Sequence, residues 1–206
     1  MKGKNNMSDY IFLFDLDSTI TKEEILPKIS NKIGKHKEMK ELTEATMRGE
    51  LQFKNSFLNR VEILKNISVA EINEIVKNVL LNEAIANFIW NNKERCYIVT
   101  GNLDVWINKL IIRLGMENHV YSSKAQVLND KIFKVTSVMN KELIVKQFIK
   151  PIVVIGDGDN DVGMAKHADI AIGFGGVRPI AKSLLENVDY VFYDDEECAN
   201  FLNKLL

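Results

Sequence analysis

A short apolar segment that runs directly into two aspartates is the feature that most constrains the fold of this chain. The segment Tyr10–Asp15 reads YIFLFD, and Asp17 follows two residues after Asp15. An apolar run of this kind, closed by turn-forming residues, predicts a β-strand that is buried on both faces. Asp15 and Asp17 then point to the same side of the extended backbone. Like charges this close repel and raise one pKa unless a cation lies between them.

The chain changes to helical spacing directly after this strand. Between about Glu24 and Asn92, apolar residues recur at intervals of three or four, as in Phe53, Phe57 and Val61. This spacing predicts roughly 70 residues of helix with no strand. We expect a small helical cap, inserted after the first strand.

Strands and helices alternate in the rest of the chain. Strands are expected at Cys96–Thr100, Pro151–Asp157, Ala168–Phe174 and Val188–Asp194, with a hairpin over Ala125–Val135 around Asn129 and Asp130. Helices are expected at Asp104–Leu114, Lys141–Ile149, Asp161–His167, after Pro179 and near the C-terminus. The alternation predicts an α/β fold, a doubly wound, mostly parallel, Rossmann-like sheet. We expect residues 1–20 and 88–206 to form this core domain and residues 21–87 to form the cap.

Three of the expected strands end in polar segments. These segments are Asp15–Thr19, Thr100–Asn102 and Gly156–Asp161, and Lys141 begins a helix between the second and the third. In parallel sheets, ligands bind at the carboxyl ends of the strands. We therefore expect the three segments and Lys141 to converge in one crevice.

Four carboxylates in one crevice require a cation. Asp15, Asp17, Asp157 and Asp161 offer the oxygen ligands that a hard divalent ion prefers, and Lys141 adds a second positive charge. Such a site suits phosphoryl transfer, which relies on positioning and on neutralising charge. Asp15 is the candidate nucleophile that forms an aspartyl-phosphate. Asp17 is the candidate acid that protonates the leaving oxygen and the base that later takes a proton from water.

Each segment also has a plainer interpretation. The DLDST segment suits a capped turn, and Lys141 alone suits a solvated helix position. The DGDND segment resembles a calcium loop, but Val162 and Ala168 stand where such a loop needs glycine and glutamate. The coincidence of four polar elements at strand ends favours the phosphoryl-transfer site, in which Thr100 and Asn160 are candidate donors to phosphate oxygens.

These motifs resemble those of the haloacid dehalogenase superfamily, and within it those of the phosphoserine phosphatases. DLDST resembles the superfamily's first motif, Thr100-Gly101 the second, Lys141 the third and GDGDND the fourth. The resemblance makes Thr100 and Gly101 candidate substrate-binding residues. Dehalogenases of the superfamily lack the second aspartate of the first motif, so Asp17 favours a phosphatase.

The resemblance also implies a cofactor. It implies that Mg²⁺ is held by Asp15, by the backbone carbonyl of Asp17 and by Asp157. Asp161 would support the water shell of the metal.

The cap carries a closer resemblance. The segment Thr46–Leu64 resembles the cap of phosphoserine phosphatases. The resemblance implies that Glu24 pairs with the ammonium group of the substrate and that Arg60 grips its carboxylate bidentately. It also implies that Met47 and Phe53 close over the substrate. The expected substrate is a small phosphorylated metabolite, with O-phospho-L-serine first.

Two departures from the family pattern leave the substrate open. Asn102 and Leu103 stand where the second motif continues with glycine and phenylalanine, and the stretch between Lys141 and Asp157 is shorter. An asparagine here narrows the pocket or contacts a different group. The alternative is a related phosphatase, or a phosphotransferase, that acts on another small phosphorylated metabolite. A signalling receiver domain is disfavoured, because it has no helical block after its first strand.

Composition favours no nucleic-acid or membrane partner. The 27 basic and 28 acidic residues give a formal charge of −1, which offers no basic surface for anionic polymers or lipids. Cys96 and Cys198 are too few for a disulfide framework. Residues 1–10 are mostly polar, without a hydrophobic signal segment. We expect a cytoplasmic protein.

Overall fold

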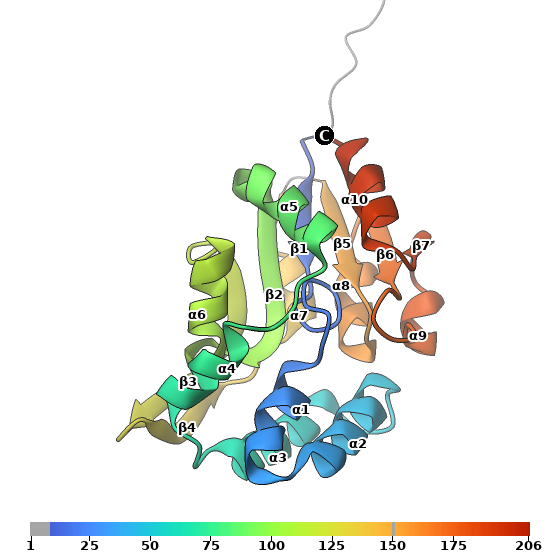
Figure 1. The fold of residues 1–206 in the computed structure, drawn as a ribbon. Helices are drawn as coiled ribbons and strands as arrows, with labels where there is room; N and C mark the ends of the chain where they lie inside the picture. The colour runs from blue at the N-terminus through green and yellow to red at the C-terminus, as the bar shows by residue number, and fades with distance from the viewer. Residues whose placement is uncertain (1–8, 150) are drawn as a thin grey trace, which may run out of the picture.

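The protein folds around one mixed sheet. The structure, a computed structural model, describes residues 9–149 and 151–206, so most of the polar N-terminal segment lies outside the described residues. The strand order is β4-β3-β2-β1-β5-β6-β7, and every neighbouring pair is parallel except β3 with β4. The order reverses at β1, as in a doubly wound sheet, which confirms the predicted fold class (Figure 1). The strands are β1 (Ile11–Phe14), β2 (Cys96–Leu103), β3 (Val120–Leu128), β4 (Lys131–Ser137), β5 (Ile152–Gly156), β6 (Ile170–Phe174) and β7 (Tyr190–Phe192).

Helices form where the sequence predicts them, but two of them are shorter. Helix α7 ends at Val145, whereas the sequence predicted a helix to Ile149. Helix α8 covers only Val162–Ala165 of the predicted Asp161–His167. The helices are α1 (Ile25–Ser30), α2 (His36–Met47), α3 (Phe53–Leu64), α4 (Val69–Val76), α5 (Glu83–Asn91), α6 (Asp104–Leu114), α7 (Lys141–Val145), α8 (Val162–Ala165), α9 (Lys182–Leu185) and α10 (Asp195–Asn203). Short 3-10 turns are η1 (Asn31–Ile33), η2 (Lys93–Arg95) and η3 (Asp159–Asp161).

Strand β1 is the centre of the core because both of its faces are covered. Phe12 and Phe14 pack in a cluster with residues of α5, α6 and α10. Ile11 and Leu13 point the other way and pack with residues of α7 and α8. The alternation follows from the two-residue period of a strand. It explains why the first strand is apolar throughout.

Strands β2 and β3 are longer than predicted. Strand β2 continues past Thr100 to Leu103, which pairs with Ser123 of β3 after an irregularity in the register. Strand β3 begins at Val120, where it runs parallel to β2, and only its later part forms the predicted hairpin with β4. Gly101 and Asn102 thus lie within a buried strand that the sequence predicted to end at Thr100.

The hairpin turn has the expected conformation. Asn129 and Asp130 have φ of 50° and 58°, the left-handed values that a tight two-residue hairpin turn requires. The tip also contacts the helical block, because the backbone N–H of Val69 donates to the carbonyl of Asp130 at 2.7 Å.

Helices α1, α2 and α3 form a separate layer beyond one end of the sheet (Figure 1). The two chain segments that lead to and from the helical block lie side by side. Thr21 and Leu81 form an isolated antiparallel bridge, and the N–H of Asn82 donates to the carbonyl of Ile20 at 2.9 Å. The two connecting segments between the helical block and the sheet are thus held to each other by backbone hydrogen bonds.

The last helices of the block lie against the core. Asn73 of α4 donates through Nδ2 to the carbonyl of Val105 in α6 at 2.6 Å. Helix α5 contacts α10, and the N–H of Ala84 donates to Asp195 at 3.0 Å. The boundary expected after residue 87 falls within α5, so we propose that the core domain resumes before Glu83.

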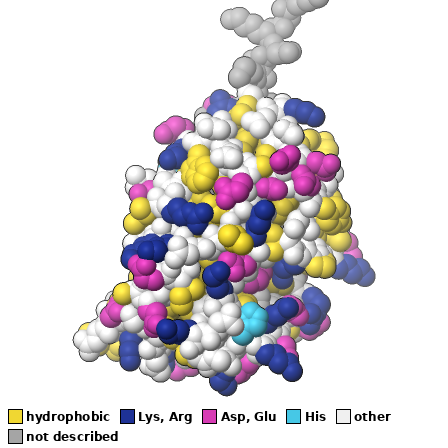
Figure 2. All heavy atoms as spheres, viewed as in Figure 1, with side chains coloured by type: hydrophobic (Ala, Val, Ile, Leu, Met, Phe, Trp, Pro, Cys, Tyr) yellow, Lys and Arg dark blue, Asp and Glu magenta, His cyan; other side chains and the backbone are white. Residues whose placement is uncertain are grey.

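The surface is of mixed charge. Figure 2 shows acidic and basic side chains interspersed over this face of the molecule. Within the described part of the chain, no helix has both the length and the apolar character needed to cross a bilayer.

Candidate active site

The strand register brings the predicted polar segments to one edge of the sheet. Phe14 of β1 pairs with Ile98 of β2 and with Ile155 of β5. Asp15 extends this pairing, because its N–H donates to the carbonyl of Ile155 at 2.9 Å. The polar segments that follow in β2 and after β5 therefore lie beside the end of β1.

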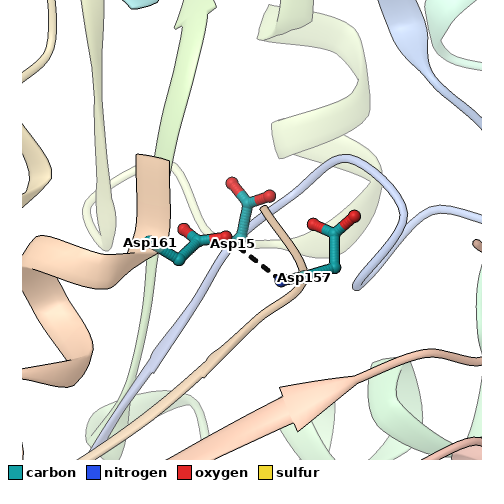
Figure 3. A group of neighbouring side chains, drawn as sticks. All are labelled: Asp15, Asp157 and Asp161. Carbon is teal, nitrogen blue, oxygen red and sulfur yellow. Dashed lines mark hydrogen bonds between the residues drawn. The ribbon is translucent and has the colours of Figure 1, made fainter. Parts of the chain in front are cut away.

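Three buried aspartates form the centre of the site. Asp15, Asp157 and Asp161 each offer a carboxylate oxygen, and these oxygens lie within 4.8 Å of one another. Figure 3 shows them gathered from the ends of β1 and β5 and from the turn before α8. The carboxylate of Asp161 accepts the N–H groups of Asp157 and Gly158 at 3.1 and 3.0 Å. This turn holds Asp161 in place, which leaves Asp15 and Asp157 with oxygens for a ligand.

Two cationic side chains contact these aspartates. Lys141, only 4% exposed, lies with Nζ 2.7 Å from Asp161 Oδ1 and also contacts Asp15. Burial lowers the pKa of Lys141, but the two carboxylates outweigh burial and raise it. Arg178, from the segment between β6 and α9, contacts Asp157 through Nε.

The charges of the site leave room for a divalent cation. The site contains five buried or partly buried acids and three cations, an excess of two negative charges when all are ionised. The acids are Asp15, Asp17, Glu24, Asp157 and Asp161, and the cations are Lys141, Arg60 and Arg178. Burial, aided by neighbouring acids, raises the pKa of Asp17 to about 6 and that of Asp157 to about 7. Carboxyl groups with raised pKa values and spare oxygens fit a hard divalent ion, which would favour their charged forms.

Asp17 is held by one donor on each carboxylate oxygen. Oδ1 accepts the N–H of Ile25, the first residue of α1, at 2.7 Å. Oδ2 accepts the side-chain amide of Asn102, which also donates to Thr100 Oγ1 at 3.1 Å. Thr100 and Asn102 share one side of β2, because they lie two residues apart. The longer β2 is thus what brings Asn102 to the site.

Glu24 and Arg60 reach the site from the cap side. The carboxylate of Glu24 accepts the Ser18 hydroxyl at 2.9 Å and lies 3.5 Å from Arg178 Nε. Burial and the charge of Asp17 raise the pKa of Glu24 to about 7. Arg60 of α3 is 3% exposed, and its Nη1 donates to the hydroxyl of Thr43 at 3.0 Å.

The cap is closed over the site. The Phe53 ring lies so close to the backbone of Gly101 that a Cβ there would overlap it, and a Cβ at Gly158 would lie 2.6 Å from Met47 Sδ. The cavity between the cap and the sheet has a volume of about 20 Å³. It is lined by Asp15, Asp17, Glu24, Leu26, Met47, Phe53, Phe57, Arg60, Gly101, Asn102 and Asn160.

The remaining predicted residues border this cavity in different ways. Lys141 lines a second cavity of about 450 Å³, which shares Phe53, Gly101 and Asn160 with the first. Asn160 Oδ1 is buried and has no hydrogen-bond partner among the described residues. Thr100 is fully buried and lines neither cavity, and its hydroxyl accepts the side-chain amide of Asn102.

The sequence interpretation missed Arg178 and Ser18 as site residues. Arg178 follows β6, another parallel strand whose carboxyl end faces the site. Because ligands bind at the carboxyl ends of parallel strands, this position in the sequence could have indicated Arg178. Ser18 has a φ of 56°, an uncommon value for a residue other than glycine. Its contact with Glu24 depends on how the loop folds back, which no local pattern specifies.

Comparison with known proteins identifies the family. The sequence model of the haloacid dehalogenase-like hydrolases matches residues 11–169. The chain therefore belongs to the haloacid dehalogenase-like hydrolases, as the motifs predicted.

Its relatives within the family include phosphoserine phosphatases. The chain is 29% identical over 186 residues to the phosphoserine phosphatase of Methanocaldococcus jannaschii, covering 84% of this chain and 88% of the relative. A solved phospho-aspartyl intermediate analogue of phosphoserine phosphatase superposes with a TM-score of 0.82 at 26% identity, covering 94% of this chain and 99% of that one. A substrate-bound phosphoserine phosphatase complex gives 0.80 at 25% identity, covering 99% of both chains.

Proposed function

We propose that this protein is a Mg²⁺-dependent phosphatase that hydrolyses O-phospho-L-serine through an aspartyl-phosphate. The observation that carries the proposal is the buried contact of Lys141 with Asp15 and Asp161 beside a cavity that also holds Glu24 and Arg60. A lysine, clustered acids and a closing cap are the parts that phosphoryl transfer from a small ester needs. The relatives named phosphoserine phosphatases support the same substrate.

The proposed reaction has two steps that share one nucleophile. In the first, a carboxylate oxygen of Asp15 attacks phosphorus and the bond to the serine oxygen breaks, while Asp17 gives that oxygen its proton. In the second, water attacks the phosphorus of the aspartyl-phosphate and Asp17 takes the proton from the water. Inorganic phosphate leaves and Asp15 is restored. Lys141 neutralises charge on the phosphoryl oxygens in both steps.

The proposed metal ligands are Asp15, the backbone carbonyl of Asp17 and Asp157. When bound, Mg²⁺ supplies positive charge to the phosphoryl group. Both carboxylate oxygens of Asp161 already accept hydrogen bonds, from Lys141 and from backbone N–H groups. This supports an indirect role for Asp161, which fixes Lys141 and the turn and supports the metal's water shell.

The proposed contacts to the amino-acid end of the substrate involve opposite charges. Glu24 offers a carboxylate to the ammonium group, and Arg60 offers a guanidinium to the carboxylate. Met47 and Phe53 cover the substrate from the cap, and Gly101 and Asn160 are the proposed phosphate-side contacts. Thr100 lines neither cavity and is proposed to act through Asn102 instead of contacting the phosphate.

The product of this reaction is L-serine, so we also propose a role in serine biosynthesis, in the cytoplasm. Both cysteines, Cys96 and Cys198, are buried free thiols. Free thiols are the usual state in a reducing compartment.

The test is phosphate release from a panel of phosphorylated amino acids, sugars and alcohols, with Mg²⁺ and then with EDTA. The expected result is fastest Mg²⁺-dependent release from O-phospho-L-serine. Asp15→Asn should lower turnover by about a thousandfold or more while the fold is kept. Normal turnover in Asp15→Asn would contradict the mechanism. Faster phosphate release from a sugar or alcohol ester would contradict the assignment of O-phospho-L-serine as the substrate.

The same assay distinguishes a phosphotransferase from a hydrolase. With a phosphotransferase, adding glycerol as acceptor would reduce the release of free phosphate and produce glycerol phosphate. A phosphorylated protein that persists without releasing phosphate would indicate a receiver-like signalling role.

A further inference from the structure

Asn102 differs from the family pattern and contacts the proposed general acid. It lies in β2, is 3% exposed and lines the cavity between the cap and the sheet. Its side-chain amide donates to Asp17 Oδ2 and to Thr100 Oγ1. Its backbone N–H also donates to Thr100 Oγ1 at 3.1 Å, so the backbone and the side chain of Asn102 are both held by the same hydroxyl of β2.

The two donors on Asp17 come from different parts of the molecule. Ile25, whose N–H binds Oδ1, begins the first helix of the cap. Asn102 belongs to the core sheet, next to the central strand. If the cap moves to admit substrate, the Ile25 contact moves with it, whereas the Asn102 contact stays with the core.

We propose that Asn102 is a positioning residue that keeps the Asp17 carboxyl aimed at the leaving oxygen of the substrate. The inference rests on the proposed function, because it assumes that Asp17 protonates that oxygen. In a site with glycine at this position, no side chain would hold Asp17 from the core side.

If Asn102 positions the general acid, the effect of losing Asn102 on the rate should depend on the leaving group of the ester. Serine and glycerol leave as poor alkoxides and need a proton in the transition state, whereas p-nitrophenolate leaves without one. Losing Asn102 should therefore slow the first step, phosphoryl transfer to Asp15, for O-phospho-L-serine and glycerol phosphate alike, and spare that step for p-nitrophenyl phosphate. A role in recognising the amino-acid end would slow O-phospho-L-serine alone, and a general distortion of the site would slow all three.

The experiment measures kcat/KM for these three esters at saturating Mg²⁺, because kcat also includes the second step, in which Asp17 acts as base for every ester. Asn102→Ala removes the donor, and Asn102→Leu removes it while keeping similar volume. Both should lower kcat/KM for the two alkyl esters by about 10- to 100-fold, part of the 10²- to 10⁴-fold typical of acid–base catalysis. The kcat/KM for p-nitrophenyl phosphate should stay within about twofold.

A double-mutant cycle tests whether Asn102 acts through Asp17. Asp17→Asn alone should show the same leaving-group pattern with a larger loss. Asn102→Ala added to Asp17→Asn should then cost nothing further, because residues that act as a unit are not additive. An equal loss on all three esters, or a full extra loss in the Asp17→Asn background, overturns the positioning role.

The same data separate this inference from the proposed function. If the wild type turns over glycerol phosphate but not O-phospho-L-serine, the proposed substrate is wrong, and the comparison with p-nitrophenyl phosphate still decides the role of Asn102. If Asp15→Asn abolishes turnover of all esters while Asn102→Ala slows them equally, the mechanism stands and the positioning role fails.

Discussion

The aromatic ring of Phe53, at the start of α3, lies directly against the backbone of Gly101 in β2. The ring is also stacked on Phe57, with centroids 5.7 Å apart and planes 8° from parallel. Glycine is therefore needed at position 101 because the Phe53 ring leaves no room for a side chain, and not because of an unusual backbone angle. The cap closes onto the core through this contact between a ring and a strand.

We predict that Gly101→Ala keeps the fold and hinders cap closure. The added methyl group would overlap the Phe53 ring, so the cap would stay displaced from the site. Small displacements of this kind cost up to about a hundredfold in rate. The measurement is kcat/KM for O-phospho-L-serine, together with the circular dichroism of the variant.

Phe53 provides the matched control for this prediction. In the double variant Gly101→Ala with Phe53→Leu, the smaller side chain makes room for the methyl group, and part of the lost activity should return. A double variant slower than both single variants would show that steric overlap is not the cause.

Lys141→Ala should destabilise the metal-free protein strongly. The substitution leaves Asp15 and Asp161 as buried neighbours without their shared cation. Breaking a buried ion pair by removing one partner costs about 3–5 kcal/mol. The measurement is urea unfolding in EDTA, and Mg²⁺ should restore part of the loss in the variant.

Lys146→Ala is the control, because Lys146 follows the same helix and pairs with Glu142 at 2.5 Å on the surface. An exposed pair contributes at most about 1 kcal/mol. Equal losses for the two lysine variants would contradict the role given to the buried pair.

Arg60→Ala should impair the enzyme selectively toward substrates that carry a carboxylate. A hydrogen bond to a charged group contributes about 1.5–3 kcal/mol, which corresponds to a loss of roughly 10- to 100-fold in kcat/KM. Phosphoethanolamine keeps the ammonium group of O-phospho-L-serine but lacks the carboxylate, so its turnover should change little. Arg48→Ala, which removes an exposed arginine of the same cap, is the control. If Arg60→Ala slows both esters equally, Arg60 does not bind the carboxylate.

The sequence predicts those residues of the site that directly follow a buried strand. Asp15 and Asp157 could be placed together because each follows a buried strand, and parallel strands end at the same edge. Arg178 was missed, although it also follows a strand. Its contacts with Asp157 and Glu24 depend on how a loop packs against the cap.

Lengths and contacts that depend on packing were harder to predict. Strand β2 was expected to end at Thr100, where turn-forming glycine and asparagine begin, yet pairing with β3 extends it to Leu103. The departure at Asn102 was visible in the sequence, but its contact with Asp17 follows only from that extension. Local patterns therefore identify the chemistry, whereas non-local pairing decides which groups meet.

The stability of the metal-free protein should fall as the pH rises toward neutrality, and Glu24 should account for part of this. Burial raises the pKa of Glu24 from 4.5 to about 7, so the folded state holds a proton that the unfolded state has lost. A raised carboxyl pKa gives stability that is fully present below about pH 4.5 and is lost as the pH passes about 7. A shift of this size corresponds to at most about 3.4 kcal/mol. Asp17 and Asp157 act in the same direction.

Glu24→Gln isolates the contribution of Glu24, because glutamine keeps the shape and cannot ionise. Unfolding free energies should be measured in EDTA for both proteins between about pH 5 and pH 8, the window set by the raised pKa. The wild type should lose stability relative to Glu24→Gln as the pH rises through this window. Parallel curves would mean that Glu24 ionises as readily in the fold as in the unfolded chain. Its carboxylate would then already be charged near neutral pH before any substrate ammonium group binds.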